Sequence, residues 1–285
     1  MDKFVQSGIV LVNKPVGISS NKVVNIVKYK LGAKKCGHLG TLDLEGAGLL
    51  PVTVNNATKL FDYYLNKTKT YEAVFVFGIE TDTLDSSGAI TKEKECDIMQ
   101  KDVEKAISSM IGRYMQMPPQ YSAKKVNGKI AYKEARKGEA VELSPKEVEI
   151  FDFKLLQKIE KNTFKFEISC SSGTYIRCLA RDLAEKLSTY GSMQCILRTR
   201  CGDFHLKDAS SMQAVENGEI NLIHCEELFD FEKVFLSKTD SEKLLNGREI
   251  DSNLTDGKYR LFDDKVFLGL GVVKNGKLKI CLRLN

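Results

Sequence analysis

The sequence has 285 residues, 42% of them hydrophobic and 28% charged, which suits a globular protein with a substantial core. Its 43 lysines and arginines exceed its 38 acidic residues by only five, so an anionic partner is permitted but not required. The eight cysteines include no Cys-x-x-Cys pair and stand beside only three histidines, which argues against a structural zinc site. Because the sequence shows neither a secretory signal nor an apolar run approaching ~18 residues, we expect a cytoplasmic protein with reduced cysteines.

The N-terminal elements are predicted from apolar runs and their boundaries. Residues 8–13 form a short apolar run, which predicts a buried strand. A helix is expected to begin at Ser19 or Ser20 and to end at Gly32, because apolar residues recur on one helical face between them. Residues 37–48 contain four glycines and predict a loop, after which the pattern predicts, in order, a strand over 49–54 and a helix through residue 61.

The central part of the chain mixes strands and helices without strict alternation. The pattern predicts, in order, a strand over 71–77, a helix after Asp102 that continues to residue 111, a strand over 164–168 and a helix over 176–187. Pro118 and Pro119 follow the first helix and prevent it from continuing. The segment 120–146 is basic and polar, which indicates a surface insertion. We therefore expect the α+β class.

The pattern of predicted elements changes near residue 230. A short helix around 242–245 is expected to end at Gly247, and strands are expected over 259–262, 266–273 and 278–284. Asn275-Gly276 lies between the last two and predicts a type I′ hairpin turn. We therefore divide the chain into a main domain over 1–230, with an insertion at about 118–146, and a small β-rich module over 231–285.

Asp43 is the leading candidate for a chemical role. It lies in the glycine-rich loop, where the absence of side chains lets the backbone approach a large ligand closely. On loop composition alone, the more ordinary interpretation is a turn in which Asp43 binds neighbouring main-chain amides.

A wider set of motifs favours the functional interpretation. Residues 35–43 (KCGHLGTLD) resemble the catalytic motif of the TruB-type pseudouridine synthases. Further stretches resemble that family's other motifs, in family order: 13–20 (NKPVGISS), 69–71 (KTY) with 78–83 (GIETDT), 118–136, 170–177 (CSSGTYIR) and 197–199 (LRT). Together they cover roughly residues 7–205, and a chance match to all of them is hard to credit although each alone is weak.

The resemblance implies both a fold and a reaction. It implies a mixed, mostly antiparallel central sheet flanked by helices, followed by a PUA-like C-terminal module. It also implies isomerisation of uridine to pseudouridine at position 55 of the tRNA T loop.

The resemblance further implies the roles of the catalytic residues. Asp43 attacks C1′ of the ribose or removes a 2′ proton, and Arg177 is its ion-pair partner. Tyr71 stacks on the flipped base, and its hydroxyl helps to move the C5 proton. Nothing is oxidised and no group is imported, so we expect neither cofactor nor metal.

The resemblance also implies residues that bind the substrate. His38 fills the space left by the flipped base or contacts phosphate, Leu197 packs against the base, and Lys14 either binds phosphate or supports the turn that follows its strand. Phosphate contacts in the insertion are assigned to Lys124, Lys125 and Arg136. The partner is then the T arm of tRNA, and we expect a monomer without an obligate protein partner or a membrane.

Leu44 departs from the family pattern, which has proline directly after the aspartate. Proline would restrict the conformation of Asp43, so the positioning of this carboxylate is the property in question. A tRNA-folding chaperone with impaired catalysis is therefore the alternative. A synthase acting on another RNA and a sugar hydrolase rank lower; the latter needs two carboxylates, whereas one stands out here.

Overall fold

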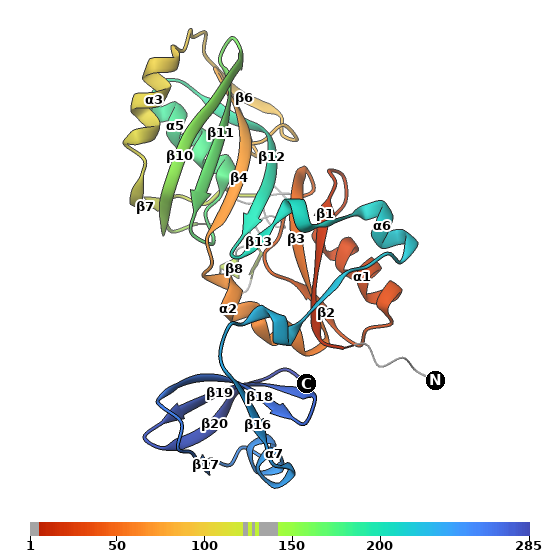
Figure 1. Cartoon of the computed structure of the whole chain (residues 1–285). Coiled ribbons are helices and arrows are strands. Elements are labelled where there is room, and N and C mark those ends of the chain that lie inside the picture. Colours follow the sequence, from red (N-terminus) through yellow and green to blue (C-terminus); the bar gives the residue numbers. More distant parts are fainter. Residues whose placement is uncertain (1–5, 122–124, 127–128, 131–141) are drawn as a thin grey trace.

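The computed structural model describes residues 6–121, 125–126, 129–130 and 142–285 (Figure 1). Within these residues, an 11-stranded sheet has the order β14-β1-β3-β12-β4-β11-β10-β7, with β2, β13 and β15 pairing beside this path. The strands are β1 (Gly8–Lys14), β2 (Cys36–His38), β3 (Gly46–Val54), β4 (Lys69–Phe77), β7 (Gly112–Gln116), β10 (Lys146–Glu160), β11 (Thr163–Cys170), β12 (Gly191–Cys201), β13 (Phe204–His205), β14 (Ser210–Ser211) and β15 (Leu222–His224). Most neighbours are antiparallel; the parallel pairs are β1 with β14 and β3 with β12. The predicted α+β class and mixed, mostly antiparallel sheet are therefore confirmed.

Helices pack against both ends of this sheet (Figure 1). The helical segments are α1 (Ser20–Leu31), η1 (Asn55–Leu60), α2 (Phe61–Leu65), α3 (Gln100–Ser108), α5 (Ile176–Lys186), η2 (Leu206–Asp208), α6 (Met212–Asn217) and η3 (Cys225–Leu228). Two small antiparallel pairs stand apart from the sheet: β5 (Ile79–Thr81) with β6 (Ile90–Glu93), and β8 (Lys125–Val126) with β9 (Lys129–Ile130).

The apolar run of β1 is continuous because this strand is buried on both faces. Val10 and Val12 belong to the cluster that also contains the apolar faces of α1, α3 and α5. Ile9 and Leu11 point to the opposite face, where they join residues of η1, α2 and the C-terminal module. A strand covered on two faces needs apolar residues at successive positions, since its side chains alternate between the faces.

The helix α1 follows its predicted boundaries. The Ser19 hydroxyl accepts a hydrogen bond from the main-chain nitrogen of Lys22, and Gly32 ends the helix in the left-handed conformation with φ of 64°. Ser20 is the first helical residue and is buried. The cap is made by Ser19, so the Ser20 hydroxyl can contact a group outside the helix.

Several predicted boundaries were wrong. The loop predicted over 37–48 is shorter, because Gly37 and His38 pair with β3 and Gly46 already begins that strand. The helix α3 begins at Gln100 rather than after Asp102, and it ends before Ile111, which is half exposed. The strands β7, β10 and β12 were not predicted; β7 and β12 pair with partners distant in sequence, whereas β10 forms a hairpin with β11.

The C-terminal module is a five-stranded sheet with the order β16-β18-β19-β20-β17 and one helix, α7 (Lys238–Leu245). Its strands are β16 (Lys233–Leu236), β17 (Ile250–Asp251), β18 (Gly257–Asp263), β19 (Val266–Lys274) and β20 (Lys277–Arg283). Asn275 and Gly276 both have positive φ, of 52° and 69°, which confirms the type I′ hairpin between β19 and β20. The expected strands are confirmed, and the division of the chain at residue 230 stays a prediction.

The module packs on the main domain through a shared apolar cluster. Leu270 and Leu284 of the module are buried together with Ile9 and Leu49 of the large sheet. At the C-terminus, the Lys59 ammonium donates to the Arg283 carbonyl at 2.9 Å. These contacts make the tail part of the main core as well as a sheet of its own.

Candidate active site

The loop between β2 and β3 carries Asp43 and is tied down on both sides. The Ser20 hydroxyl accepts from the Leu42 main-chain nitrogen at 2.9 Å and donates to the Leu42 carbonyl at 2.8 Å. On the other side, the Leu44 carbonyl accepts from the Gly17 main-chain nitrogen at 2.9 Å. The Asp43 carbonyl itself closes a turn with the Gly46 nitrogen at 3.0 Å. The main chain of this loop is therefore fixed, while the Asp43 side chain is 56% exposed.

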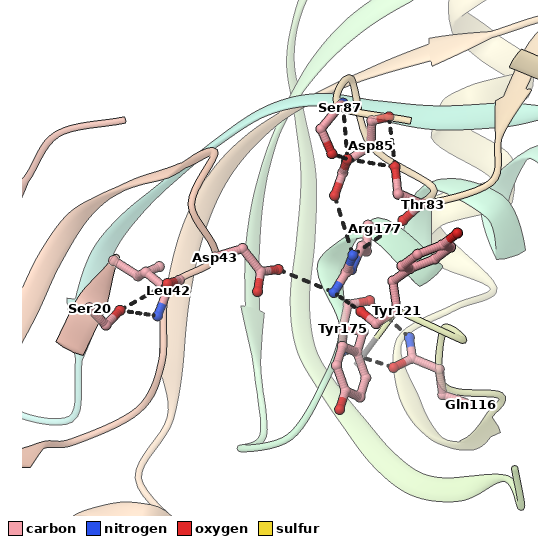
Figure 2. Close-up of polar contacts among 10 residues, drawn as sticks. All are labelled: Ser20, Leu42, Asp43, Thr83, Asp85, Ser87, Gln116, Tyr121, Tyr175 and Arg177. Carbon is pink, nitrogen blue, oxygen red and sulfur yellow. Dashed lines mark hydrogen bonds and ion pairs between the residues drawn. The ribbon is translucent and has the colours of Figure 1, made fainter. Parts of the chain in front are cut away.

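Arg177 links Asp43 to a second carboxylate (Figure 2). Its Nη2 lies 3.3 Å from Oδ2 of Asp43, and its Nη1 lies 3.3 Å from Oδ2 of Asp85. The same two nitrogens donate to the carbonyls of Tyr121 at 2.8 Å and Thr83 at 3.3 Å. The arginine is thus held by several acceptors, and one edge of its guanidinium faces the exposed carboxylate of Asp43.

The first turn of α5 presents this arginine. The amide group of Gln116 accepts from the Tyr175 nitrogen at 2.9 Å and donates to the Tyr175 carbonyl at 3.2 Å (Figure 2). Gln116 is the last residue of β7 and is 1% exposed, so the start of α5 is attached to the edge of the large sheet. Arg177 is a helical residue and its side chain is buried.

Asp85 was not recognised in the sequence. Its Oδ1 accepts from the Thr83 hydroxyl at 2.7 Å, the Ser87 nitrogen at 3.1 Å and the Ser87 hydroxyl at 2.5 Å. The residue directly before it, Leu84, has φ of 63°, an unusual conformation for a non-glycine residue. The hydroxyl-rich spacing Thr-x-Asp-x-Ser, typical of turns in which Asp accepts from nearby groups, was the available signal.

Tyr71 lies on β4 and is buried, with 8% of its surface exposed. It pairs with Ile168 of β11 on one side and with Arg198 of β12 on the other. Burial raises the pKa of the Tyr71 phenol well above its usual value, and the Arg198 guanidinium acts in the opposite direction. A stacking residue beside a cavity and a core residue both fit this burial, so the role of Tyr71 stays a prediction.

Three buried cations lie under the site. Lys14, Lys69 and Arg198 are all at most 5% exposed. The Lys14 ammonium donates to the carbonyls of Ile18 at 2.7 Å and Pro15 at 2.9 Å, and it approaches the Leu44 carbonyl at 3.4 Å. These contacts place Lys14 inside the turn that it follows.

Burial lowers the pKa of Lys14 to about 8, and the nearby charge of Asp43 opposes this shift. The ammonium is therefore committed to main-chain acceptors, and this geometry favours support of the loop over phosphate binding.

The remaining predicted residues fall into two groups. His38 is the last residue of β2, where burial and the Arg198 charge lower the pKa of its imidazole. Leu197 is half-buried on β12 directly before Arg198. In the insertion, Lys124, Arg136 and the side chain of Lys125 lie outside the described residues, so their proposed phosphate contacts stay predictions.

Within the described part of the chain, no group of His, Cys, Asp or Glu has the arrangement of a metal site. In the same residues, no helix is long and apolar enough to cross a membrane.

The chain shares its overall fold with solved structures. Among solved structures, an archaeal Nop10–Cbf5 complex matches with a TM-score of 0.69 at 17% identity, covering 99% of this chain and 87% of that one. An H/ACA ribonucleoprotein bound to a substrate RNA matches with a TM-score of 0.68 at 18% identity, covering 99% and 86%. At these identities the likeness concerns the fold.

Sequence comparison identifies the family. The model of the TruB family pseudouridylate synthase N-terminal domain matches residues 28–176, and that of the TruB pseudouridine synthase II C-terminal region matches 233–279. Proteins named tRNA pseudouridine synthase B from Caldanaerobacter subterraneus and Alkaliphilus oremlandii are 36% and 38% identical, covering 95% and 94% of this chain and 97% and 94% of theirs. The chain belongs to the TruB family of pseudouridylate synthases, which are isomerases.

Proposed function

We propose that this chain isomerises uridine 55 in the T loop of tRNA, with Asp43 acting on the ribose. The observation that carries the proposal is the exposed Asp43 carboxylate held against the buried guanidinium of Arg177. A carboxylate that needs to reach a substrate must be open on one side and oriented on the other, and Asp43 meets both conditions. The names of the relatives, tRNA pseudouridine synthase B, support tRNA as the substrate.

The reaction requires an ionised carboxylate next to C1′ of the flipped nucleotide. Cleavage of the glycosidic bond places positive charge on the ribose. Asp43 neutralises this charge in one of two ways: its carboxylate attacks C1′, or it removes the proton from C2′. Arg177 fixes the direction of the carboxylate and keeps a positive charge beside it. The remaining contacts of Arg177, to Asp85 and two carbonyls, keep this cation in place when substrate approaches.

Tyr71 is proposed to act on the detached base. Its ring provides a surface for stacking, and its hydroxyl relays the proton that leaves C5 after the new bond to the ribose forms. Leu197 is proposed as an apolar contact of the base, and His38 as a residue near the space that the base vacates. The T-arm contacts are assigned to the basic insertion, with Lys124, Lys125 and Arg136.

The direct test is pseudouridine formation on an unmodified tRNA transcript with purified protein and a chelator present. We expect multiple turnover on the wild-type transcript and none when position 55 is cytidine. Binding without turnover would favour the chaperone alternative. Turnover at a different uridine would contradict the assignment of the position.

Binding through the insertion has its own test. Replacing Lys124, Lys125 and Lys129 together by glutamine should flatten the salt dependence of tRNA binding. The log–log slope should fall by about 0.7–0.9 for each phosphate that is no longer neutralised by a lysine. An unchanged slope would show that this segment is a solvated face.

The position of Leu44 favours the enzyme over the chaperone. Its carbonyl accepts from the Gly17 nitrogen and lies near the Lys14 ammonium, and its side chain is 52% exposed. The loop conformation is thus secured by hydrogen bonds on both sides of Asp43, where the family pattern has proline.

A further inference from the structure

Arg198 occupies a central position beneath the proposed site, outside the set of residues that the proposed reaction uses. It is 1% exposed and is the largest fully buried side chain of the described residues. On β12 it stands directly opposite Tyr71 of β4, so the two side chains share one face of the sheet. Its guanidinium also lies close enough to affect the charge states of Lys14, His38 and Lys69.

The main chain around Arg198 leaves its side chain little freedom. Its Nε donates to the Leu49 carbonyl at 2.7 Å, and its Nη2 donates to the Gly40 carbonyl at 3.1 Å. A side chain at Gly48 would place its Cβ 2.4 Å from the Arg198 carbonyl oxygen, so β3 and β12 approach here as closely as backbones allow. The guanidinium is therefore fixed between β3 and the loop that leads to Asp43.

Such a residue is costly for stability alone. A buried cation loses its hydration, and here two further buried cations, Lys14 and Lys69, lie nearby. Apolar residues of similar volume often replace buried charges without loss of stability. A role of the Arg198 charge in the chemistry therefore explains the burial of this residue better than a role in packing does.

Tyr71 is the group on which that charge acts most directly. The titratable groups that affect its hydroxyl are Arg198 and Cys201 of β12 and Cys170 of β11. Burial raises the pKa of the phenol; among these neighbours only Arg198 carries a positive charge, and it lowers the pKa through that charge and a side-chain hydrogen bond.

We propose that Arg198 is a positioning residue for Tyr71, which holds the phenol oxygen toward the base and stabilises the negative charge that develops there during proton transfer. The inference rests on the proposed function. After the C1′–C5 bond forms, the Tyr71 hydroxyl gives its proton to water, and the resulting phenolate, stabilised by Arg198, takes the proton from C5. The C5–H electron pair forms the C5=C6 double bond, the C6=N1 pair moves onto N1, and N1 takes up a proton from water. The atoms and charges balance, and the phenol returns to its initial state.

The same guanidinium connects this step to the other half of the site. Gly40 precedes Asp43 by three residues in the loop, and its carbonyl is the acceptor for Nη2 of Arg198. Tyr71 and the Asp43 loop are thereby positioned by one rigid group.

A titration of the phenol tests the electrostatic part without using activity. A fluorinated tyrosine at position 71, whose phenol is more acidic, allows the pKa to be followed by 19F NMR while the protein is folded. Arg198→Gln should raise this pKa by about one unit or more, because removing a neighbouring positive charge disfavours the phenolate. Arg198→Lys should raise it by a smaller but measurable amount, because the ammonium keeps a positive charge but cannot donate to both the Leu49 and the Gly40 carbonyls in the same geometry. Arg200→Gln is the matched control: this arginine lies on the same strand, donates to the Gly202 carbonyl and is exposed, so the titration should not change.

An unchanged titration in folded Arg198→Gln would overturn the proposal. Should that variant fail to fold, Arg198→Lys decides through a kinetic isotope effect. With tRNA carrying deuterium at C5 of the target uridine, single-turnover rates should show a larger isotope effect in Arg198→Lys than in the wild type, because proton removal from C5 becomes slower. If Arg198→Lys lost rate but showed an unchanged isotope effect, Arg198 would act in an earlier step, and its proposed role in proton removal from C5 would be wrong. A wild type without pseudouridine formation would reject the proposed function, while the titration would still decide the role of Arg198.

Discussion

The Arg177 guanidinium lies 3.3 Å from the Asp43 carboxylate, and the two side chains differ sharply in exposure, at 8% against 56%. The buried partner is restrained by Asp85 and by two carbonyls, so it does not depend on Asp43 for its position. The exposed Asp43 carboxylate is oriented by this contact and stays accessible to a substrate. A structural ion pair would be expected to bury both partners or to expose both.

Asp43→Asn should abolish pseudouridine formation and leave the fold intact. The amide keeps the size of the side chain but cannot act as a nucleophile or base. The loss should reach at least about 10⁴-fold in turnover, as when other enzymes lose such a group. The free energy of unfolding should change by no more than about 0.5 kcal/mol, since the side chain is exposed. Multiple turnover by this variant, prepared free of host synthase, would contradict the assignment.

Asp85→Asn should weaken both stability and turnover. Asp85 is 8% exposed at its side chain and pairs with Arg177, so removing its charge leaves a buried cation less well compensated. Breaking such pairs costs about 3–5 kcal/mol, and the lower end applies because Asp43 remains nearby. Denaturant unfolding measures the loss. Asp203→Asn is the control, because its pair with Lys67 at 3.5 Å is largely exposed and should contribute under about 0.5 kcal/mol.

Tyr71→Phe and Tyr71→Leu separate the ring from the hydroxyl. The phenylalanine variant should bind tRNA normally and turn over poorly, because the proton relay is lost. The leucine variant should also lose stacking, worth about 1–3 kcal/mol per base, measured as weaker binding of a T-arm stem–loop. Equal turnover of both variants and the wild type would make Tyr71 a core residue.

Leu44→Pro should leave turnover equal or improved. The exposed side chain and the carbonyl-based contacts of Leu44 are compatible with a proline, which would restrict Asp43 further. Single-turnover rates of the variant and wild type provide the comparison. A large loss of activity would show that the nitrogen of Leu44 or its conformation is needed.

Lys14→Met tests the buried ammonium through the pH dependence of stability. The folded-state pKa is lowered to about 8 from 10.5, so between these values the unfolded chain binds more protons than the folded one. The wild type should therefore gain stability relative to the variant as pH rises from about 8 to 10.5, by at most about 1.4 kcal/mol per unit. Below pH 8 the difference should be constant. A flat difference across the whole range would show that Lys14 titrates normally.

Local sequence was enough to predict several helices, strands and turns and to single out Asp43 as the leading candidate for a chemical role. The apolar run of β1, the Ser19 cap and Gly32 end of α1, and the Asn275-Gly276 turn depend on neighbouring residues, so their patterns predicted them. Asp43 was recognised for a related reason, since its motif is contiguous along the chain.

Tertiary structure alone decided the partners of these residues. The strand β12 pairs with β3 and β4, which lie far away in sequence, and it was not predicted. The strand β10 forms a hairpin with its neighbour β11 and was also missed. Asp85 meets Arg177, and Arg198 meets Tyr71, only because the register of β4, β12 and the start of α5 brings them together. The sequence therefore determined which residue types were present and which short elements they form. Distances of a few ångströms between charges, on which the chemistry depends, are set by long-range pairing that no local pattern encodes.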